Sequence, residues 1–257
     1  MTTLETNLHV RVWGEGHPER VVLLHGGNVP DPERIWQAQR PLANEFEVIV
    51  VDRRGFGQSP DATAPLTWDG EVADALALVG ERAHVVGHSY GGVIALLLAG
   101  RFPERVRSLV AIEPPAFGLA LDDTAVAAYA ARLAPVHAAA PVLSPDEFLR
   151  RFVAAHGEEL PADFAFKPAH RKGVDATRLS PDPARAPIAV EPLAAAPCPK
   201  LVASGVWTPE METTCDRLAA LIGAQRAVFP GTHHSPQRLG TPFNDWLRAV
   251  FRAAQTH

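Results

Sequence analysis

The chain has 257 residues, of which 47% are hydrophobic and 21% charged, and its formal net charge is −5. This length and composition are typical of a globular protein with one sizeable hydrophobic core. Acidic residues and arginines are interleaved along the chain, so we expect no nucleic-acid partner. The longest apolar stretches, such as residues 93–99, are far shorter than the roughly 20 residues of a membrane helix, so we expect no membrane span.

The cysteines and the amino terminus predict the compartment. Cys198 and Cys215 fit neither a disulfide framework nor a pattern of metal ligands, so we expect two packing residues and no metal site. The first ten residues, MTTLETNLHV, lack the basic start and apolar block of a signal peptide. We therefore expect a cytoplasmic protein.

Runs of apolar and β-branched residues recur along the chain and predict strands. They cover 8–13, 20–25, 46–52, 83–89, 108–113, 200–205 and 224–231. Helical patterns occupy 67–80 and 90–101, and an amphipathic helix with an apolar face from Phe243 to Phe251 closes the chain. This alternation predicts an α/β fold, with a mostly parallel sheet covered by helices on both faces.

The alternation lapses between about residues 116 and 197, in a segment rich in alanine and proline. Helical patterns at 123–134 and 145–155 carry apolar stripes that need a surface to bury, which favours a folded insertion over a disordered one. We predict a helical cap at 116–197, inserted into a core domain made of 1–115 and 198–257.

The strongest chemical signal is VVGHSYGG at 85–92, a Gly-x-Ser-x-Gly motif where a predicted strand meets a predicted helix. Gly87 and Gly91 suit a turn so sharp that side chains at those positions would clash, which leaves Ser89 exposed at the strand tip. The free N–H groups at the start of the following helix would face any anion formed there. We therefore predict that Ser89 is a nucleophile.

With this motif, the chain resembles the α/β-hydrolase-fold superfamily, as a serine hydrolase or esterase-like member. His25-Gly26-Gly27-Asn28 resembles the family's oxyanion loop, and residues 52–59, DRRGFGQS, resemble its D-x-R-G-x-G-x-S turn. The resemblance covers roughly 1–115 and 198–257. It implies a mostly parallel sheet of the eight-stranded type with a cap, and no metal or organic cofactor.

The resemblance also implies the roles of several residues. The backbone N–H groups of Gly27 and Tyr90 would form an oxyanion hole. Ser89 needs a base, and His233 and His234 both follow the last strand, where the family places its histidine. Spacing alone does not separate the two, but the family's Gly-x-Gly-His frame favours His234 as the base and leaves His233 as an exposed loop residue.

The acid that orients this histidine departs from the family's usual pattern. After the strand at 200–205 the family places a carboxylate, but this chain has none there until Glu210 and Glu212. Glu113 instead ends the strand expected to lie beside that of Ser89, where some members, including haloalkane dehalogenases, carry their acid. A carboxylate at the edge of an apolar interior needs a partner. We predict Glu113 as the acid, with Glu210 or Glu212 next and a serine–histidine dyad last.

Further residues are expected around the substrate or as braces of the loops. We expect substrate contacts from Asn28, His88, Phe117 and Trp207. Tyr129, Phe148 and Phe152 could add further walls to an apolar pocket, although each is more typical of plain core. We expect loop-bracing roles for His25, Asp52 and Arg54.

Together these features predict a serine hydrolase that cleaves a carboxylic ester, thioester or lactone of a small apolar substrate through an acyl-enzyme. The same serine and histidine also suit carbon–carbon bond hydrolysis of a diketone. A weakly catalytic small-molecule receptor and an acyltransferase that excludes water are the remaining alternatives.

Overall fold

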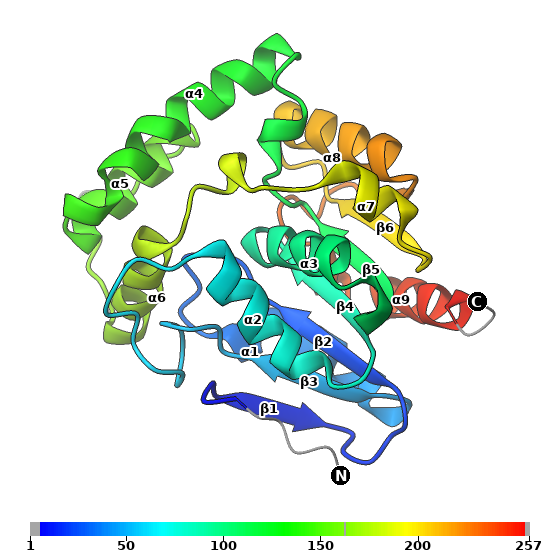
Figure 1. Cartoon of the computed structure of the whole chain (residues 1–257). Coiled ribbons are helices and arrows are strands. Elements are labelled where there is room, and N and C mark those ends of the chain that lie inside the picture. Colours follow the sequence, from blue (N-terminus) through cyan, green and yellow to red (C-terminus); the bar gives the residue numbers. More distant parts are fainter. Residues whose placement is uncertain (1–5, 162, 255–257) are drawn as a thin grey trace.

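A computed structural model describes residues 6–161 and 163–254 (Figure 1). Within them, seven strands form one sheet in the order β1-β3-β2-β4-β5-β6-β7. The strands are β1 (Val10–Trp13), β2 (Arg20–Leu24), β3 (Glu47–Val51), β4 (Ala83–His88), β5 (Val106–Ile112), β6 (Lys200–Ser204) and β7 (Gln225–Val228). All neighbours are parallel except β1, which pairs antiparallel with β3. Every predicted strand is confirmed, although the described chain holds seven strands where the eight-stranded type was expected.

Helices cover both faces of this sheet. The α-helices on these faces are α1 (Pro32–Trp36), α2 (Trp68–Val79), α3 (Tyr90–Arg101), α8 (Pro209–Ile222) and α9 (Thr241–Ala253). The 3₁₀ segments are η1 (Gln37–Asn44), η2 (Pro103–Arg105) and η6 (Pro236–Leu239). One buried cluster joins α2, α3 and α8 to alternate strand residues such as Val22 and Leu24. The other joins α1, η1 and α9 to the intervening residues, such as Val21 and Leu23. The period of two along each strand thus builds a core on each side of the sheet.

Between β5 and β6 the chain is helical, which confirms the capped α/β-hydrolase class. The segment contains η3 (Phe117–Leu119), α4 (Thr124–Ala139), η4 (Ala140–Val142), α5 (Pro145–Ala155), α6 (Pro168–Leu179), η5 (Pro183–Arg185) and α7 (Val190–Ala195). Figure 1 shows α4 and α5 standing away from the sheet beyond its carboxyl edge, while α6 lies against the core near α2. The division into a core domain and a cap at 116–197 stays a prediction.

Two helices of this segment, α6 and α7, were missed by the sequence patterns, and α4 is longer than predicted. The predicted helix ended at residue 134, whereas α4 continues through Pro135 to Ala139. The prediction of no membrane span concerns a different feature: no helix in the described ranges is both long enough and apolar enough to cross a bilayer. The expected absence of a signal peptide concerns residues that lie partly outside the described ones.

Candidate active site

Ser89 lies at the turn between β4 and α3, where the backbone is too crowded for any residue but glycine on either side. A Cβ on Gly87 would lie 2.2 Å from the Gly91 carbonyl oxygen, and a Cβ on Gly91 would lie 2.2 Å from that of Leu24. Ser89 has a positive φ of 53°, and its N–H donates to the Ile112 carbonyl at 2.8 Å. The sharp turn thus holds the serine at the tip of β4 and at the amino end of α3, as the motif predicted.

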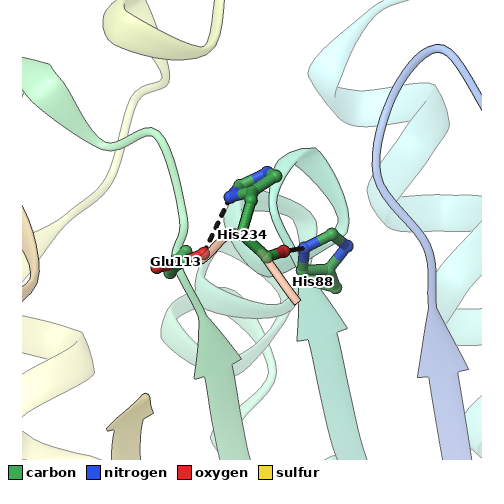
Figure 2. Close-up of side chains that lie close together, drawn as sticks. All are labelled: His88, Glu113 and His234. Carbon is green, nitrogen blue, oxygen red and sulfur yellow. Dashed lines mark hydrogen bonds and ion pairs between the residues drawn. The ribbon is translucent and has the colours of Figure 1, made fainter. Parts of the chain in front are cut away.

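Glu113 and His234 meet beside this turn (Figure 2). Glu113 follows β5, the parallel neighbour of β4, and its side chain is fully buried. His234 Nδ1 donates to Glu113 Oε2 at 2.8 Å, and the Gly205 N–H donates to Glu113 Oε1 at 2.8 Å. Both carboxylate oxygens therefore have a donor, which offsets the cost of burying the charge.

Burial shifts the pKa of both partners. It raises the pKa of the Glu113 carboxyl to about 7, against the opposing effect of the hydrogen bond from the Gly205 N–H. Burial, with a smaller effect of the His156 imidazole, lowers the pKa of His234. The neutral imidazole is thus the resting form, and Glu113 is the group whose protonation state changes near neutral pH.

His88 lies behind this pair and does not line the cavity, contrary to its expected role in substrate contact. Its imidazole is buried, and Nε2–H donates to the backbone carbonyl of His234 at 2.7 Å (Figure 2). Because His88 ends the fully buried strand β4, its side chain lies below the surface that Ser89 presents. His88 holds the histidine loop in place from beneath.

The alternative acids, Glu210 and Glu212, and the alternative base, His233, lie outside the Glu113–His234 pair. Glu212 accepts hydrogen bonds from Ser204 Oγ at 2.7 Å and from Arg226 Nη2 at 2.7 Å, so it braces the loop after β6. Glu210 lies in the first turn of α8, where acids favour the helix dipole. No hydrogen bond or ion pair between described residues joins Glu210 or Glu212 to a histidine. His233 is exposed, with a φ of 49°.

The loop after β2, which was predicted to carry the oxyanion hole, is oriented by its own histidine. The N–H of Arg53 donates to His25 Nε2 at 3.1 Å, which leaves the ring proton on Nδ1, and this group donates to the Gly26 carbonyl at 2.8 Å. The Gly26 carbonyl and the Gly27 N–H belong to one trans peptide, so they point in opposite directions. Holding the carbonyl toward His25 therefore turns the Gly27 N–H away from it.

Arg53, which was not predicted to have a role, supports the same loop. Its Nη1 donates to the carbonyls of His25 at 3.3 Å and Gly26 at 3.2 Å. Its Nη2 forms a buried ion pair with Glu71 at 2.6 Å, and the guanidinium lies 4.6 Å from the ring centroid of Tyr90. The hydrogen-bonded partners lie 18 to 28 positions away in the sequence and Tyr90 lies further still, so no local pattern could have identified the role of Arg53.

The braces expected after β3 are present. Asp52 accepts hydrogen bonds from Arg11 Nη1 at 2.8 Å and from the Gln58 N–H at 2.9 Å. Arg54 Nη2 donates to Asp74 Oδ1 on α2 at 2.7 Å. Together they hold the turn that contains Arg53, and Arg53 contacts the loop after β2.

Backbone strain gathers around this edge of the sheet. The non-glycine residues with positive φ in the described ranges are Asn28, Ser89, Glu113, Val206 and His233, with φ between 43° and 62°. One follows each of the adjacent strands β2, β4, β5, β6 and β7. Such a conformation costs roughly 1–3 kcal/mol per residue and persists where the surroundings over-determine it.

Between this edge and the cap lies a cavity of about 250 Å³. Ser89 and His234 line it together with Gly27, Asn28 and Tyr90. Its apolar lining comes from Pro115, Phe117, Leu133, Phe152, Val153, Pro181, Pro183, Ala184, Trp207 and Met211, and its polar cap lining from His137, His156, Glu158, Thr177, Ser180 and Asp182. Asn28, Phe117, Phe152 and Trp207 lie where they were expected.

Two candidate cavity walls are core residues instead. Tyr129 and Phe148 are absent from the cavity lining, in agreement with the core role favoured for them. Phe148 packs inside a small apolar cluster of the cap with Val136 and Leu149, and Tyr129 packs against Phe117 in the main core. Their apolar stripes therefore stabilise the cap and its attachment to the core.

Ser89 and His234 share the cavity wall, and no hydrogen bond joins them among the described residues. Such bonds often form only when a substrate is bound. The ligand atoms of His88, Glu113 and His234 lie within 4.8 Å of one another, as in some metal sites. However, Glu113 Oε2 and His234 Nδ1 are bonded to each other, and His88 Nε2 to a backbone carbonyl, so this cluster suits proton transfer better than a cation.

Known proteins resemble the chain in sequence and in fold. Lipase LipV of Mycobacterium tuberculosis is 37% identical over 124 residues, 47% of this chain and 45% of the lipase. The 2-hydroxy-6-oxo-2,4-heptadienoate hydrolase of Pseudomonas putida is 40% identical over 114 residues, 42% of this chain and 40% of that enzyme. The chain thus spans less than half the length of these relatives.

The likeness in fold extends further than the likeness in sequence. A solved carboxylesterase structure from the thaumarchaeon Nitrososphaera gargenis superposes with a TM-score of 0.68 at 17% identity, covering 100% of this chain and 98% of that one. The model of the alpha/beta hydrolase family matches residues 21–246, which include Ser89, Glu113 and His234. On this match and on the sheet, turn and cap described above, the chain belongs to the alpha/beta hydrolase family.

Proposed function

We propose that this chain is a serine hydrolase that cleaves an ester-like bond of a small, uncharged and mostly apolar substrate. The observation that carries the proposal is the hydrogen bond from His234 Nδ1 to Glu113 Oε2, beside a cavity that Ser89 also lines. Because Nδ1 carries the proton, the lone pair of the neutral imidazole is on Nε2, where it can accept a proton from a serine hydroxyl.

The proposed reaction proceeds in two halves. Ser89 Oγ attacks the carbonyl carbon while its proton passes to His234 Nε2, and the Glu113 carboxylate stabilises the imidazolium. The N–H groups of Gly27 and Tyr90 donate to the developing oxyanion. His234 then protonates the leaving group, which departs and leaves an acyl-enzyme. A water molecule, deprotonated by His234, hydrolyses the acyl-enzyme and restores Ser89.

The charge of the cavity lining supports an uncharged substrate. Asp182 and Glu158 are its acidic side chains, and no lysine or arginine is among the described lining residues. Burial lowers the pKa of both His137 and His156, so these imidazoles are neutral at neutral pH. A carboxylate in the substrate would meet two acids and no cation in this cavity.

Carbon–carbon bond hydrolysis is the second candidate, because the heptadienoate hydrolase resembles this chain. A heptadienoate is a carboxylate, for which the lining residues offer no basic partner. The ester-like bond therefore remains the first choice. A purely binding function would not require the hydrogen bond from His234 to the buried Glu113, whose two carboxylate oxygens both have donors.

The test combines turnover with active-site labelling. We expect hydrolysis of p-nitrophenyl butyrate and stoichiometric labelling of Ser89 by a fluorophosphonate. Ser89→Ala should lose both, with turnover reduced by up to about a million-fold. A panel of acyl chain lengths, lactones and diketones would then rank the bonds cleaved. Tight binding of these compounds with neither turnover nor labelling would contradict the proposal and favour a receptor.

A further inference from the structure

The helix α6 packs against the oxyanion loop more closely than the rest of the cap. A Cβ on Gly173 would lie 2.5 Å from the Val29 carbonyl oxygen, so only glycine permits this approach. One turn later on the same face, Thr177 is buried, and its methyl and hydroxyl groups would lie 3.0 and 3.2 Å from a Cβ placed on Gly27. Thus α6 presents Gly173 and Thr177 to the loop that follows β2.

Thr177 also makes a specific hydrogen bond to that loop. The Asn28 N–H donates to Thr177 Oγ1 at 2.7 Å, and Oγ1 donates to the Gly173 carbonyl at 2.8 Å. The second bond fixes the hydroxyl proton, so a lone pair faces the Asn28 N–H. Asn28 is one of the strained residues, with a φ of 52°, and this bond holds it there.

The loop is therefore held from two sides. From the core, His25 and Arg53 hold the carbonyl of the Gly26–Gly27 peptide. From the cap, Thr177 holds the N–H of the next peptide, which Asn28 provides. The orientation of the Gly27 N–H between these anchors depends on both.

We propose that Thr177 is a positioning residue through which the cap holds the oxyanion hole in its productive geometry. This inference rests on the proposed function, because it assumes an oxyanion at Gly27 and Tyr90. When α6 is seated, the Asn28 peptide is fixed and the Gly27 N–H is aligned; when α6 moves away, the loop loses its acceptor and the donor is misaligned. The cap thus makes the hole as well as enclosing the substrate.

The test compares four variants. Thr177→Val removes the acceptor and keeps the shape, and Thr177→Ala removes the acceptor without adding bulk. Thr177→Ser keeps the hydroxyl and removes the methyl group. The matched control is Thr214→Val on α8, because Thr214 Oγ1 also donates to the carbonyl four residues earlier, that of Glu210, at 2.8 Å.

We expect Thr177→Val and Thr177→Ala to lower kcat for p-nitrophenyl butyrate by about ten- to a hundredfold, the scale of a misplaced catalytic group, with KM changed less than about twofold. Thr177→Ser should restore most of kcat. The second readout is an aryl trifluoromethyl ketone: Ser89 Oγ adds to its carbonyl carbon, the proton passes to His234, and a hemiketal oxyanion results. Its inhibition constant should rise in parallel with the loss of kcat.

Each outcome bears on the proposal. If Thr177→Val merely matches Thr214→Val, losing thermal stability while keeping kcat and ketone affinity, Thr177 has only a structural role. If Thr177→Ser is as slow as Thr177→Val, the methyl group and not the hydroxyl matters, and the proposal is wrong. If the native chain shows no turnover that depends on Ser89, the proposed function fails, which is a separate result. Should Thr177→Val fail to fold, Thr177→Ala gives the same comparison.

Discussion

The carboxyl edge of the sheet and the cap wall the same cavity, but they are stabilised differently. At the edge, Ser89 and Glu113 follow strand ends on strained backbone, and the Glu113 carboxylate is bonded to His234 and to the Gly205 N–H, both far away in the sequence. In the cap, α4, α5 and α6 pack through a small apolar cluster, and the segment between β5 and β6 presents Glu158, Asp182 and neutral histidines to the cavity. The contrast assigns chemistry to the edge and selection to the cap, with α6 linking the two.

The largest loss of activity is expected when the acid at the sheet edge, Glu113, is replaced. Glu113→Gln supplies one side-chain oxygen where the carboxylate supplies two, for the Gly205 N–H and for His234 Nδ1–H. If the amide oxygen pairs with Gly205, the NH₂ group faces Nδ1 and forces the wrong imidazole tautomer. We expect kcat to fall by about ten-thousand-fold, with the melting temperature changed little, as measured by ester hydrolysis and circular dichroism.

The matched controls are the acids beside β6. Glu210→Gln should leave kcat nearly unchanged, because no bond between described residues joins Glu210 to a histidine. Glu212→Gln weakens the bonds to Ser204 and Arg226 and should lower stability more than kcat. A large loss of kcat in Glu210→Gln, with Glu113→Gln active, would reverse the assignment.

Local patterns predicted the position of Ser89 at the sheet edge because a crowded turn restricts which residues can surround it. Gly87 and Gly91 cannot carry a side chain, so the motif around Ser89 identifies the turn without an alignment. The pairing of Glu113 with His234 joins residues 121 positions apart. It could be foreseen only through the resemblance to the family, which supplied the expected order of strands and members that carry their acid at this place, together with the missing acid after β6.

The cap was harder to predict for physical reasons. The helix α6 contacts the core through Gly173, Ala176 and Thr177, small residues that make no large apolar stripe. The helix α4 continues past its predicted end and through Pro135, where a proline costs one N–H bond but the helix buries residues on both sides, Leu133 and Val136. Arg53 was missed because its ion pair and loop contacts are all long-range.

The next largest effect is the expected change of kcat/KM with pH as Glu113 titrates. Burial raises the pKa of Glu113 to about 7 and lowers that of His234. Below its pKa, the Glu113 carboxyl is protonated, so it no longer holds Nδ1–H or stabilises the imidazolium. We therefore expect kcat/KM to be full above neutral pH and to fall about tenfold per pH unit below about pH 7.

Rate profiles from pH 5 to 9 would measure this acid limb, and Glu113→Gln shows which group causes it. The variant should lose the limb along with most of its activity, because a glutamine does not titrate. If the limb persisted at the same pH in Glu113→Gln, another group, foremost the His234 imidazole, would control the rate.

The smallest effect tests the cap as the selecting side. Asp182 lines the cavity and its Oδ1 caps η5 by accepting from the Ala184 N–H, a bond that asparagine can keep. Removing one acid near a substrate carboxylate is worth about 1 kcal/mol at partly screened distances, or about fivefold. Asp182→Asn should therefore improve kcat/KM about fivefold for mono-p-nitrophenyl glutarate but not for p-nitrophenyl pentanoate, which has the same chain length without the charge.

Asp122→Asn is the control, because it removes the same charge from an exposed pair with Arg217 outside the cavity. If both variants changed the ratio between the two esters equally, the selection would come from the net charge of the protein and not from the cap. If neither changed it, the acidic lining would not reach the acyl chain, and selection would lie with the apolar walls around Phe117 and Trp207. A rise in kcat/KM for the charged ester that is confined to Asp182→Asn would assign selection to the cap, because the proposed acyl-transfer groups at the sheet edge are unchanged in this variant.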